Sequence, residues 1–244
     1  MLDQNQDAYG AELRAYLAYG EKIEIVERDD LYLEYNESIT NYFLPYEHWT
    51  IYEKAAIRFA SGRALDVGCG AGRVSLHLQD RGLKVVAIDN SPGAVKISSD
   101  RGVKDARLLD FSAASATNVG SFDSVVMFGN NFGLFGSFSE ARDHLKRLGS
   151  MTYSGAAIIA QTTDPYATTD PVHLNYHKRN REQGRMGGQI RLRLRHKQVV
   201  GEWFDYLLVS KQELEDIVSG TCWKVEKYIN TLGPQYFVIL RKQE

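Results

Sequence analysis

A glycine-rich turn near residue 70 is the part of this 244-residue sequence whose residue types best suit ligand binding. An apolar run at residues 64–67 leads into Gly68, Gly70 and Gly72, and a helical pattern follows. Glycine at such a turn lets the backbone change direction sharply and approach a ligand without a collision at Cβ. The spacing therefore predicts a small-molecule site at a junction between a strand and a helix.

The same turn disfavours a dinucleotide site. Such sites prefer the pattern G-x-G-x-x-G, which counted from Gly68 requires glycine at position 73, and this sequence has Arg73 there. Asp66 ends the preceding strand, where a loop built to bind pyrophosphate gains nothing from a carboxylate. A nicotinamide-dependent oxidoreductase is therefore kept only as an alternative.

Two further acidic residues follow apolar runs. Asp89 closes the second run, where a carboxylate can accept hydrogen bonds from both hydroxyls of a ribose. Asp110 and Phe111 follow the third run, and an acidic acceptor beside an aromatic face suits an adenine. Each acid alone could instead cap the next helix. Together with Asp66 they lie at carboxyl ends of predicted strands, the edge where open α/β sheets bind ligands.

The elements that must position these residues alternate regularly. Short apolar runs separated by helical stretches are typical of a doubly wound, mostly parallel sheet with helices on both faces. Ser91 followed by Pro92 predicts the start of one helix, and Ser210 with Glu213 predicts a capping box at another. The five predicted strands of this region cover residues 64–67, 84–88, 107–109, 124–128 and 156–160.

The remaining segments are expected to complete one domain. We predict a tyrosine-rich N-terminal helical cap at residues 1–60, a ligand-binding core at 61–164 and a small β insertion at 165–209 that covers the substrate site. In the insertion, Ile190, Leu192 and Leu194 alternate with arginines, which predicts a half-buried strand paired with a second one at about 199–209. Residues 210–244 should supply a helix and a final strand pair.

Composition limits the classes of partner. The 29 basic and 31 acidic side chains leave a formal net charge of -2, so no overall attraction to nucleic acid or to an anionic membrane is expected. The sequence lacks the pattern of a signal peptide or a membrane span, and only two cysteines occur. We therefore expect a cytoplasmic protein without a membrane partner. The six histidines show no metal-ligand spacing, so no metal site is expected.

Four segments resemble successive motifs of class I S-adenosylmethionine-dependent methyltransferases. They are Leu-Asp-Val-Gly-Cys-Gly-Ala-Gly-Arg at 65–73, Ala-Ile-Asp-Asn-Ser at 87–91, Leu-Asp-Phe at 109–111 and Phe-Asp-Ser-Val-Val-Met-Phe-Gly-Asn at 122–130. The resemblance implies a Rossmann-like sheet of seven strands whose last strand is antiparallel. It also implies the cofactor S-adenosylmethionine, whose positive sulfonium and ammonium groups suit nearby carboxylates.

The resemblance also implies roles for individual residues. The methionine part of the cofactor would lie on Asp66 and the loop Gly68–Gly70, the ribose on Asp89 and Asn90, and the adenine on Asp110 and Phe111. The residues after the fourth strand would line the cofactor near its methyl group. The full predicted set is Asp66, Gly68, Cys69, Gly70, Asp89, Asn90, Asp110, Phe111, Phe128, Gly129 and Asn130.

The resemblance implies a methyltransferase, and a small-molecule acceptor with an O, N or C nucleophile is the leading hypothesis. No catalytic base is assigned, because methyl transfer can proceed by positioning and desolvation alone. Residues 128–132 read Phe-Gly-Asn-Asn-Phe, unlike the Asn-Pro-Pro-Tyr type of tetrad used on adenine or glutamine amide groups. The alternatives are an RNA methyltransferase that uses the basic segment 178–197, or a non-catalytic S-adenosylmethionine-binding module.

Overall fold

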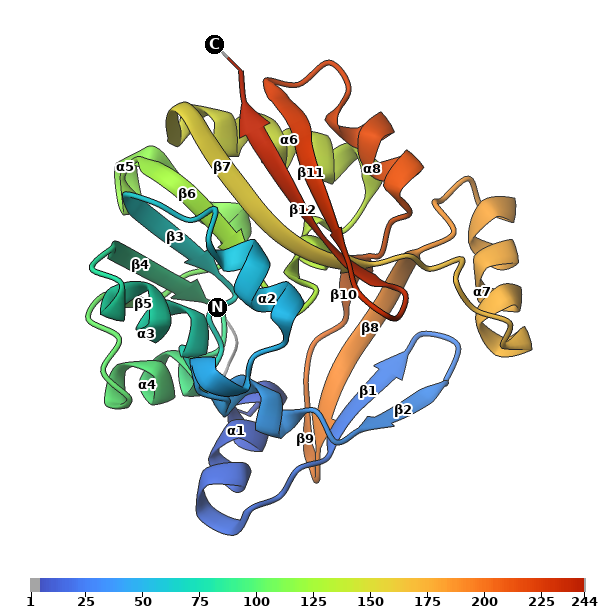
Figure 1. Ribbon diagram of the computed structural model, residues 1–244. Helices are drawn as coiled ribbons and strands as arrows, with labels where there is room; N and C mark the ends of the chain where they lie inside the picture. Colours follow the sequence, from blue (N-terminus) through green and yellow to red (C-terminus); the bar gives the residue numbers. More distant parts are fainter. Residues whose placement is uncertain (1–4, 244) are drawn as a thin grey trace. The chain divides into compact units, whose positions relative to one another are not determined.

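The computed structural model describes residues 5–243 (Figure 1). The chain divides into two compact units, each built from separate stretches of sequence. Unit 1 takes in the chain up to Thr50, Gly62–Ala114 and Arg191–Phe204. Unit 2 takes in Ile51–Ser61, Ser115–Ile190 and the chain from Asp205. Within residues 5–243, no helix is long and apolar enough to cross a membrane.

A seven-stranded sheet has the strand order β11-β12-β7-β6-β3-β4-β5. Pairing is parallel between β3 and β4, β4 and β5, and β6 and β7, whereas β12 runs antiparallel to both β7 and β11. This mixed α/β sheet confirms the predicted Rossmann-like fold, including its antiparallel last strand. The strands are β3 (Arg63–Val67), β4 (Lys84–Asp89), β5 (Ala106–Leu108), β6 (Phe122–Met127), β7 (Thr152–Thr163), β11 (Trp223–Asn230) and β12 (Gln235–Lys242).

Two helices of unit 1 follow the first two strands of the sheet. The helix α3 (Arg73–Asp80) contacts β3 and β4, and α4 (Pro92–Asp100) contacts β4 and β5. Ser91 caps α4 as predicted: its Oγ accepts a hydrogen bond of 3.0 Å from the Ala94 N–H, and proline is the first helical residue. The short 3₁₀ helix η3 (Phe111–Ala113) follows β5.

The N-terminal part of unit 1 differs from the predicted helical cap. It contains α1 (Ala8–Tyr19), the strands β1 (Glu24–Arg28) and β2 (Leu33–Asn36), and the 3₁₀ helices η1 (Ile39–Phe43) and η2 (Tyr46–His48). The helical interpretation is thus wrong for residues 24–36. The period-two strand β8 (Gln189–His196) pairs with β1, and a local pattern cannot reveal a partner so distant along the chain.

The predicted β insertion therefore belongs to a second sheet with the order β10-β8-β1-β2. Its remaining strands are the short β9 (Val199–Val200), which pairs with β8, and β10 (Phe204–Leu207). The second strand predicted at about 199–209 is thus present in two pieces next to β8. The hairpin of β1 and β2, missed from the sequence, extends this sheet on the other side of β8.

Unit 2 carries helices on both faces of its strands. The helix α2 (Ile51–Ile57) contacts β12 and β11, and Figure 1 shows α6 (Phe138–Ser150) behind these strands. The predicted capping box is present at the start of α8 (Lys211–Val218), where Ser210 and Glu213 bond reciprocally. Two further helices are α5 (Ala116–Val119) and α7 (Pro171–Glu182), and the 3₁₀ helix η4 (Asn131–Phe135) follows β6.

The helix α7 was not predicted, because its sequence is polar and lacks an apolar stripe. Its start nevertheless carries a local signal: the Asp170 side chain accepts a hydrogen bond of 2.8 Å from the Val172 N–H, and Pro171 is the first helical residue. Capping chemistry therefore could have located this helix where periodicity did not.

Candidate cofactor site

The glycine loop lies between β3 and α3 in unit 1. The N–H groups of Gly68 and Cys69 both donate to the Ile88 carbonyl, at 2.9 and 3.1 Å, which ties the loop to the end of β4. Gly70 has φ +54°, and a Cβ placed on it would lie 2.5 Å from the Tyr9 hydroxyl oxygen. Glycine is required here for both reasons, backbone conformation and the close approach of Tyr9.

Asp89 holds this loop from the end of β4. Its Oδ2 accepts a hydrogen bond of 2.9 Å from the Gly70 N–H, and its Oδ1 accepts one of 2.9 Å from the Ser91 N–H. Burial raises the pKa of the Asp89 carboxyl to about 6, although the two amides favour the charged form. At neutral pH the group is an anion fixed beside the loop. Asn90, the next residue, is exposed.

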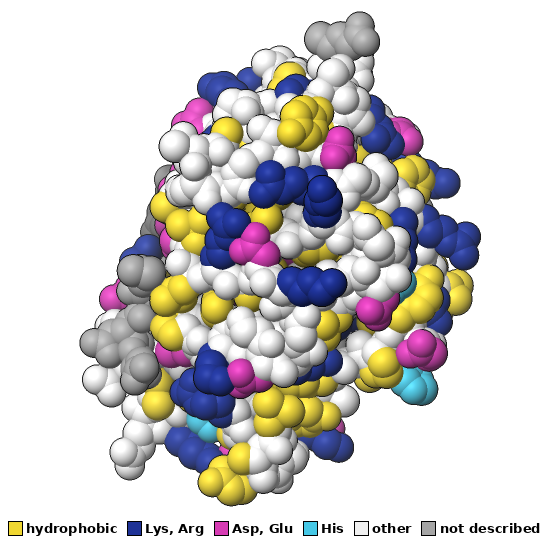
Figure 2. Space-filling view, turned by 90° about the vertical axis from the view of Figure 1, so that its left-hand side faces the viewer, with side chains coloured by type: hydrophobic (Ala, Val, Ile, Leu, Met, Phe, Trp, Pro, Cys, Tyr) yellow, Lys and Arg dark blue, Asp and Glu magenta, His cyan; other side chains and the backbone are white. Residues whose placement is uncertain are grey.

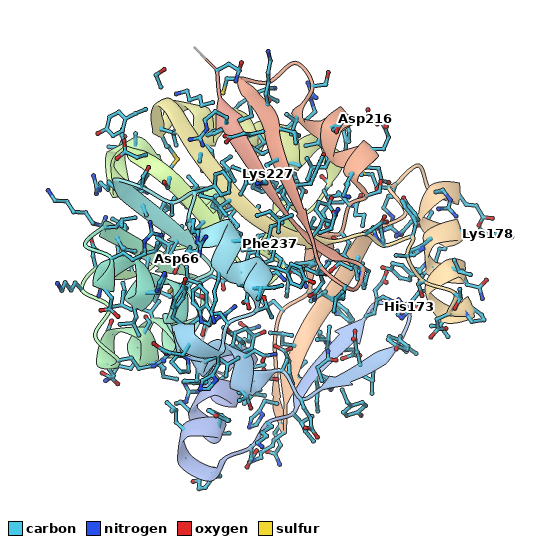
Figure 3. The ribbon with its side chains drawn as sticks, in the orientation of Figure 1. Asp66, His173, Lys178, Asp216, Lys227 and Phe237 are labelled. Atoms are coloured by element: carbon cyan, nitrogen blue, oxygen red, sulfur yellow. The ribbon has the colours of Figure 1, made fainter. Side chains whose placement is uncertain are left out.

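Asp66 lies at the end of β3 and is almost completely buried. Figure 3 labels it among the side chains of unit 1. Its Oδ2 accepts a hydrogen bond of 2.6 Å from the Ser75 hydroxyl on α3. Burial raises the pKa of its carboxyl to about 6, and the nearby charge of Asp89 adds to this effect. Two carboxylates at the ends of neighbouring strands thus make this edge of the sheet strongly acidic.

Asp110 and Phe111 follow β5 at the same edge, because Asp89 pairs with Leu108 in the parallel register. The Asp110 Oδ1 accepts hydrogen bonds from the N–H and the hydroxyl of Ser112, at 2.7 and 2.6 Å. This is the capping role that the sequence left open, and Phe111 is 8 % exposed. The structure thus brings the acids of three adjacent strands to one edge of the sheet. Each of these carboxylates also accepts at least one hydrogen bond from a neighbouring backbone or side-chain group.

Cys69 is a buried free thiol packed with Ala87 and Val103. Burial raises its pKa well above the ordinary value, and the charge of Asp89 acts in the same direction. The side chain therefore stays a neutral thiol and fills space inside the loop. The described residues contain no group of three or more His, Cys, Asp or Glu side chains that could hold a metal ion.

Phe128, Gly129 and Asn130 lie in unit 2, after β6. Phe128 packs on Phe237 of β12, with ring centroids 5.0 Å apart, and Figure 3 labels the latter. The Gly129 N–H donates to the Gln161 side-chain oxygen at 2.9 Å. Asn130 adopts φ +62°, and its carbonyl accepts a hydrogen bond of 2.6 Å from the Tyr206 hydroxyl. These bonds shape the turn, and the role beside the cofactor's methyl group stays a prediction.

Asp7 is a residue of this region that sequence reasoning missed. It is buried, and its Oδ1 accepts hydrogen bonds from the Gly10 N–H at the start of α1 and from the Ser91 hydroxyl, at 2.9 and 2.6 Å. Its Oδ2 accepts a third, of 2.8 Å, from the Gly93 N–H in α4. One carboxylate therefore joins the first turns of two helices beside Asp89. An N-cap pattern could have indicated Asp7, but not its distant partners.

Three basic side chains near the end of segment 178–197 are paired with acids. Arg193 and Arg195 both contact Glu27 of β1, at 2.8 and 3.0 Å, and the Arg193 guanidinium also lies 4.4 Å from the centre of the Trp203 ring. Lys197 pairs with Glu21 at 2.7 Å. Figure 2 shows a different face, the one that is on the left in Figure 1, and there too Lys and Arg side chains are interspersed with Asp and Glu. These ion pairs thus account for part of the positive charge that motivated the RNA alternative.

Comparisons with known proteins agree with this geometry. Residues 64–149 match the family model of a methyltransferase domain. Over its whole length the fold resembles that of a Bacteroides fragilis S-adenosylmethionine-dependent methyltransferase solved with S-adenosyl-L-homocysteine, with a TM-score of 0.83, 24 % identity, and coverage of 100 % of this chain and 98 % of that one. Residues 64–149 are thus similar to a methyltransferase domain, and the chain has the fold of class I S-adenosylmethionine-dependent methyltransferases.

Individual relatives are more distant or match only in part. A ubiquinone biosynthesis O-methyltransferase of Xanthomonas oryzae pv. oryzae is 37 % identical over 79 residues, which is 30 % of this chain and 33 % of that protein. A methyltransferase of Methanosarcina mazei has a TM-score of 0.58 and 16 % identity, covering 75 % of this chain and 93 % of that one. The matched part thus spans about a third of the length of such curated relatives.

Proposed function

We propose that this protein binds S-adenosylmethionine on the glycine loop and methylates a small-molecule acceptor. The observation that carries the proposal is the loop itself: Gly70 adopts the left-handed backbone conformation of a tight turn at the end of β3, and Asp89 fixes the loop by accepting the Gly70 N–H. When bound, the cofactor supplies a methyl group made electrophilic by the positive sulfur.

The residues in unit 1 fit this cofactor by charge and by position. Asp66 and the loop Gly68–Gly70 would face the methionine part, and Asp89 with Asn90 would accept the ribose hydroxyls. Each Asp89 oxygen already accepts one backbone hydrogen bond, and a carboxylate oxygen has a second lone pair for a hydroxyl donor. Phe111 offers an aromatic face next to Asp110 for an adenine.

The proposed contribution of the protein to catalysis is positioning and exclusion of water. Burial of Asp66 and Asp89 places negative charge in a region of low dielectric, where it acts more strongly on a positive ligand than it would in water. Phe128, Gly129 and Asn130 are proposed to lie near the methyl group. We assign no catalytic base.

A small-molecule acceptor is favoured because Arg193, Arg195 and Lys197 of the basic segment are already paired with acids. The O-methyltransferase relative does not determine the acceptor atom, since the match covers only a third of that protein. The alternative is a protein that binds the cofactor but does not catalyse methyl transfer. It would be distinguished from an enzyme by cofactor binding together with no methylation of any compound in a panel of acceptors.

The test is calorimetric titration of the purified chain with S-adenosylhomocysteine, S-adenosylmethionine and NAD. We expect binding of the two adenosyl ligands, weakened by about tenfold or more in Asp89→Ala through loss of charge-assisted hydrogen bonds. The matched control is Asp100→Ala, which removes an exposed carboxylate of α4 that pairs with Lys96. Urea unfolding of both variants separates loss of ligand contacts from loss of fold. Binding of NAD alone would contradict the proposal.

A further inference from the structure

A buried group of polar side chains in unit 1 lies beside the glycine loop. Its centre is Glu24 of β1, which is 8 % exposed. The Tyr42 hydroxyl donates to its Oε1 at 3.0 Å, and the Ser38 hydroxyl donates to its Oε2 at 2.7 Å. Two neutral donors thus hold the Glu24 carboxyl in one orientation inside the N-terminal part of the chain.

A second acid, Glu12 of α1, lies close to Glu24. It is 1 % exposed, and within residues 5–243 neither of its carboxyl oxygens has a hydrogen-bond partner. Burial raises the pKa of Glu12 to about 9, and the charge of Glu24 adds to the rise, whereas the nearby Ile25 backbone opposes it without reaching hydrogen-bond geometry. A buried carboxyl without a partner is costly, and its retention calls for an explanation.

Tyr9 connects this pair of acids to the cofactor loop. Its hydroxyl lies against Gly70, and its ring meets the Tyr42 ring edge-on with centroids 5.3 Å apart. Burial raises the pKa of Tyr9 well above its ordinary value, and Tyr42, Asp89 and Glu24 add to the effect. The ionisable groups that act most strongly on Tyr9, Glu12 and Glu24 are acids, tyrosines and a thiol, and none of them is basic.

We propose that Glu12 and Glu24, with the hydroxyls and rings of Tyr9 and Tyr42, form a binding site for an ammonium group beside the glycine loop. An ammonium has one positive charge and three donors, which the carboxyl oxygens of Glu24 and Glu12 can accept once a nearby cation offsets the burial that raises the pKa of Glu12. The rings of Tyr9 and Tyr42 can in addition contact an organic cation that approaches over a ring face. Calcium or magnesium would require about six oxygen ligands, more than two carboxylates supply.

The ammonium group has two chemical sources. It is either the amino group of the cofactor's methionine part or an amine on the methyl acceptor, and both are consistent with a position next to Gly70. The inference rests on the proposed function and deepens it. In both cases the N-terminal segment supplies side chains that recognise the ligand beside the glycine loop.

The first arm of the test compares two adenosyl ligands that differ in the amino acid part. Calorimetry measures binding of S-adenosylhomocysteine and 5′-methylthioadenosine to the wild type, Glu12→Gln and Glu24→Gln. If the cofactor supplies the ammonium, Glu24→Gln weakens S-adenosylhomocysteine by about tenfold, the loss of one charge-assisted contact, and leaves 5′-methylthioadenosine unchanged. The exposed Glu37→Gln is the matched control and should bind both like the wild type.

The second arm compares amines with alcohols of the same shape, with and without S-adenosylhomocysteine. The probes are 2-phenylethylamine against 2-phenylethanol and 1,4-diaminobutane against 1,4-butanediol, and the readout is the melting temperature. If the acceptor supplies the ammonium, amines stabilise the wild type more than alcohols do, and both glutamine variants lose the difference.

The site is supported if the variants lose affinity for S-adenosylhomocysteine but not for 5′-methylthioadenosine. It is also supported if the variants lose the preference for amines over alcohols. The proposal is overturned if the variants bind both adenosyl ligands like the wild type and amines act like alcohols. It is also overturned if both adenosyl ligands weaken equally, because that result indicates a structural role. Wild-type protein that binds no adenosyl ligand contradicts the proposed function, and the amine arm without S-adenosylhomocysteine then tests the ammonium site separately.

Discussion

Replacing Gly70 by alanine tests the close approach of the N-terminal helix to the glycine loop. The new Cβ would lie 2.5 Å from the Tyr9 hydroxyl oxygen and 3.6 Å from the ring carbon that carries it, so the clash is with the hydroxyl. Tyr9 is half-buried and its ring meets the Tyr42 ring edge-on, so moving its hydroxyl away from a new Cβ disturbs that contact. The structure therefore predicts two separate penalties, one from the left-handed backbone conformation and one from the clash.

The magnitudes follow from these two terms. A non-glycine residue in the left-handed region costs about 1–2 kcal/mol, and inserting one carbon into a packed site costs about 1–3 kcal/mol more. We expect Gly70→Ala to lower the free energy of unfolding by about 2–5 kcal/mol. Gly20→Ala is the matched control, because Gly20 has φ +72° and no atom within 4 Å of a built Cβ, so only the first penalty applies.

The assay is urea unfolding of Gly70→Ala, Gly20→Ala, Tyr9→Phe and the double variant Gly70→Ala/Tyr9→Phe. Without the hydroxyl, the nearest Tyr9 atom is the ring carbon at 3.6 Å from the new Cβ, which is an ordinary contact. The double variant should therefore regain the part of the free energy of unfolding that Gly70→Ala loses through the clash. Equal destabilisation by Gly70→Ala and Gly20→Ala would refute the predicted contact. A double variant no more stable than Gly70→Ala would show that the hydroxyl is not the obstacle.

Three further predictions concern buried groups. Asp7→Ala removes one hydrogen bond that caps α1 and two that tie Asp7 to the start of α4, and it should lower the free energy of unfolding in urea by about 2–4 kcal/mol. A loss below about 0.5 kcal/mol, typical of surface sites, would contradict the buried geometry. For Glu12, the folded-state pKa is raised from 4.5 to about 9, so the folded state binds the extra proton and stability falls as pH rises through this window. Glu12→Gln should therefore flatten the decline in melting temperature between pH 5 and 9, and an unchanged slope would show that Glu12 is not the group responsible. A thiol reagent at pH 8 should label Cys222 quickly and Cys69 only on unfolding, because Cys69 is buried with a raised pKa; rapid labelling of Cys69, followed by mass spectrometry of peptides, would contradict its packing.

The alternation of apolar runs and helices was sufficient to predict the main sheet. Each βα unit is a local pattern, so β3, β4, β6 and β7 could be located from residue spacing, and the caps at Ser91 and Ser210 from local hydrogen-bond chemistry. The hairpin of β1 and β2 could not be located in this way. Its strands are stabilised by pairing with β8, far away in the sequence, and single-sequence periodicity does not contain that information.

For the candidate site, too, local sequence features were predictable and long-range contacts were not. The sequence alone determined which residues lie at the carboxyl ends of the strands, because the glycine spacing and the acids at Asp66, Asp89 and Asp110 are local features of each strand end. Only the tertiary structure decided what those acids bond to and which distant residues join them. Tyr9 over Gly70 and Asp7 on Ser91 are contacts across more than 60 positions of sequence. Such contacts form because packing of α1 against α4 brings the N-terminal segment to the loop, and no local pattern specifies that packing.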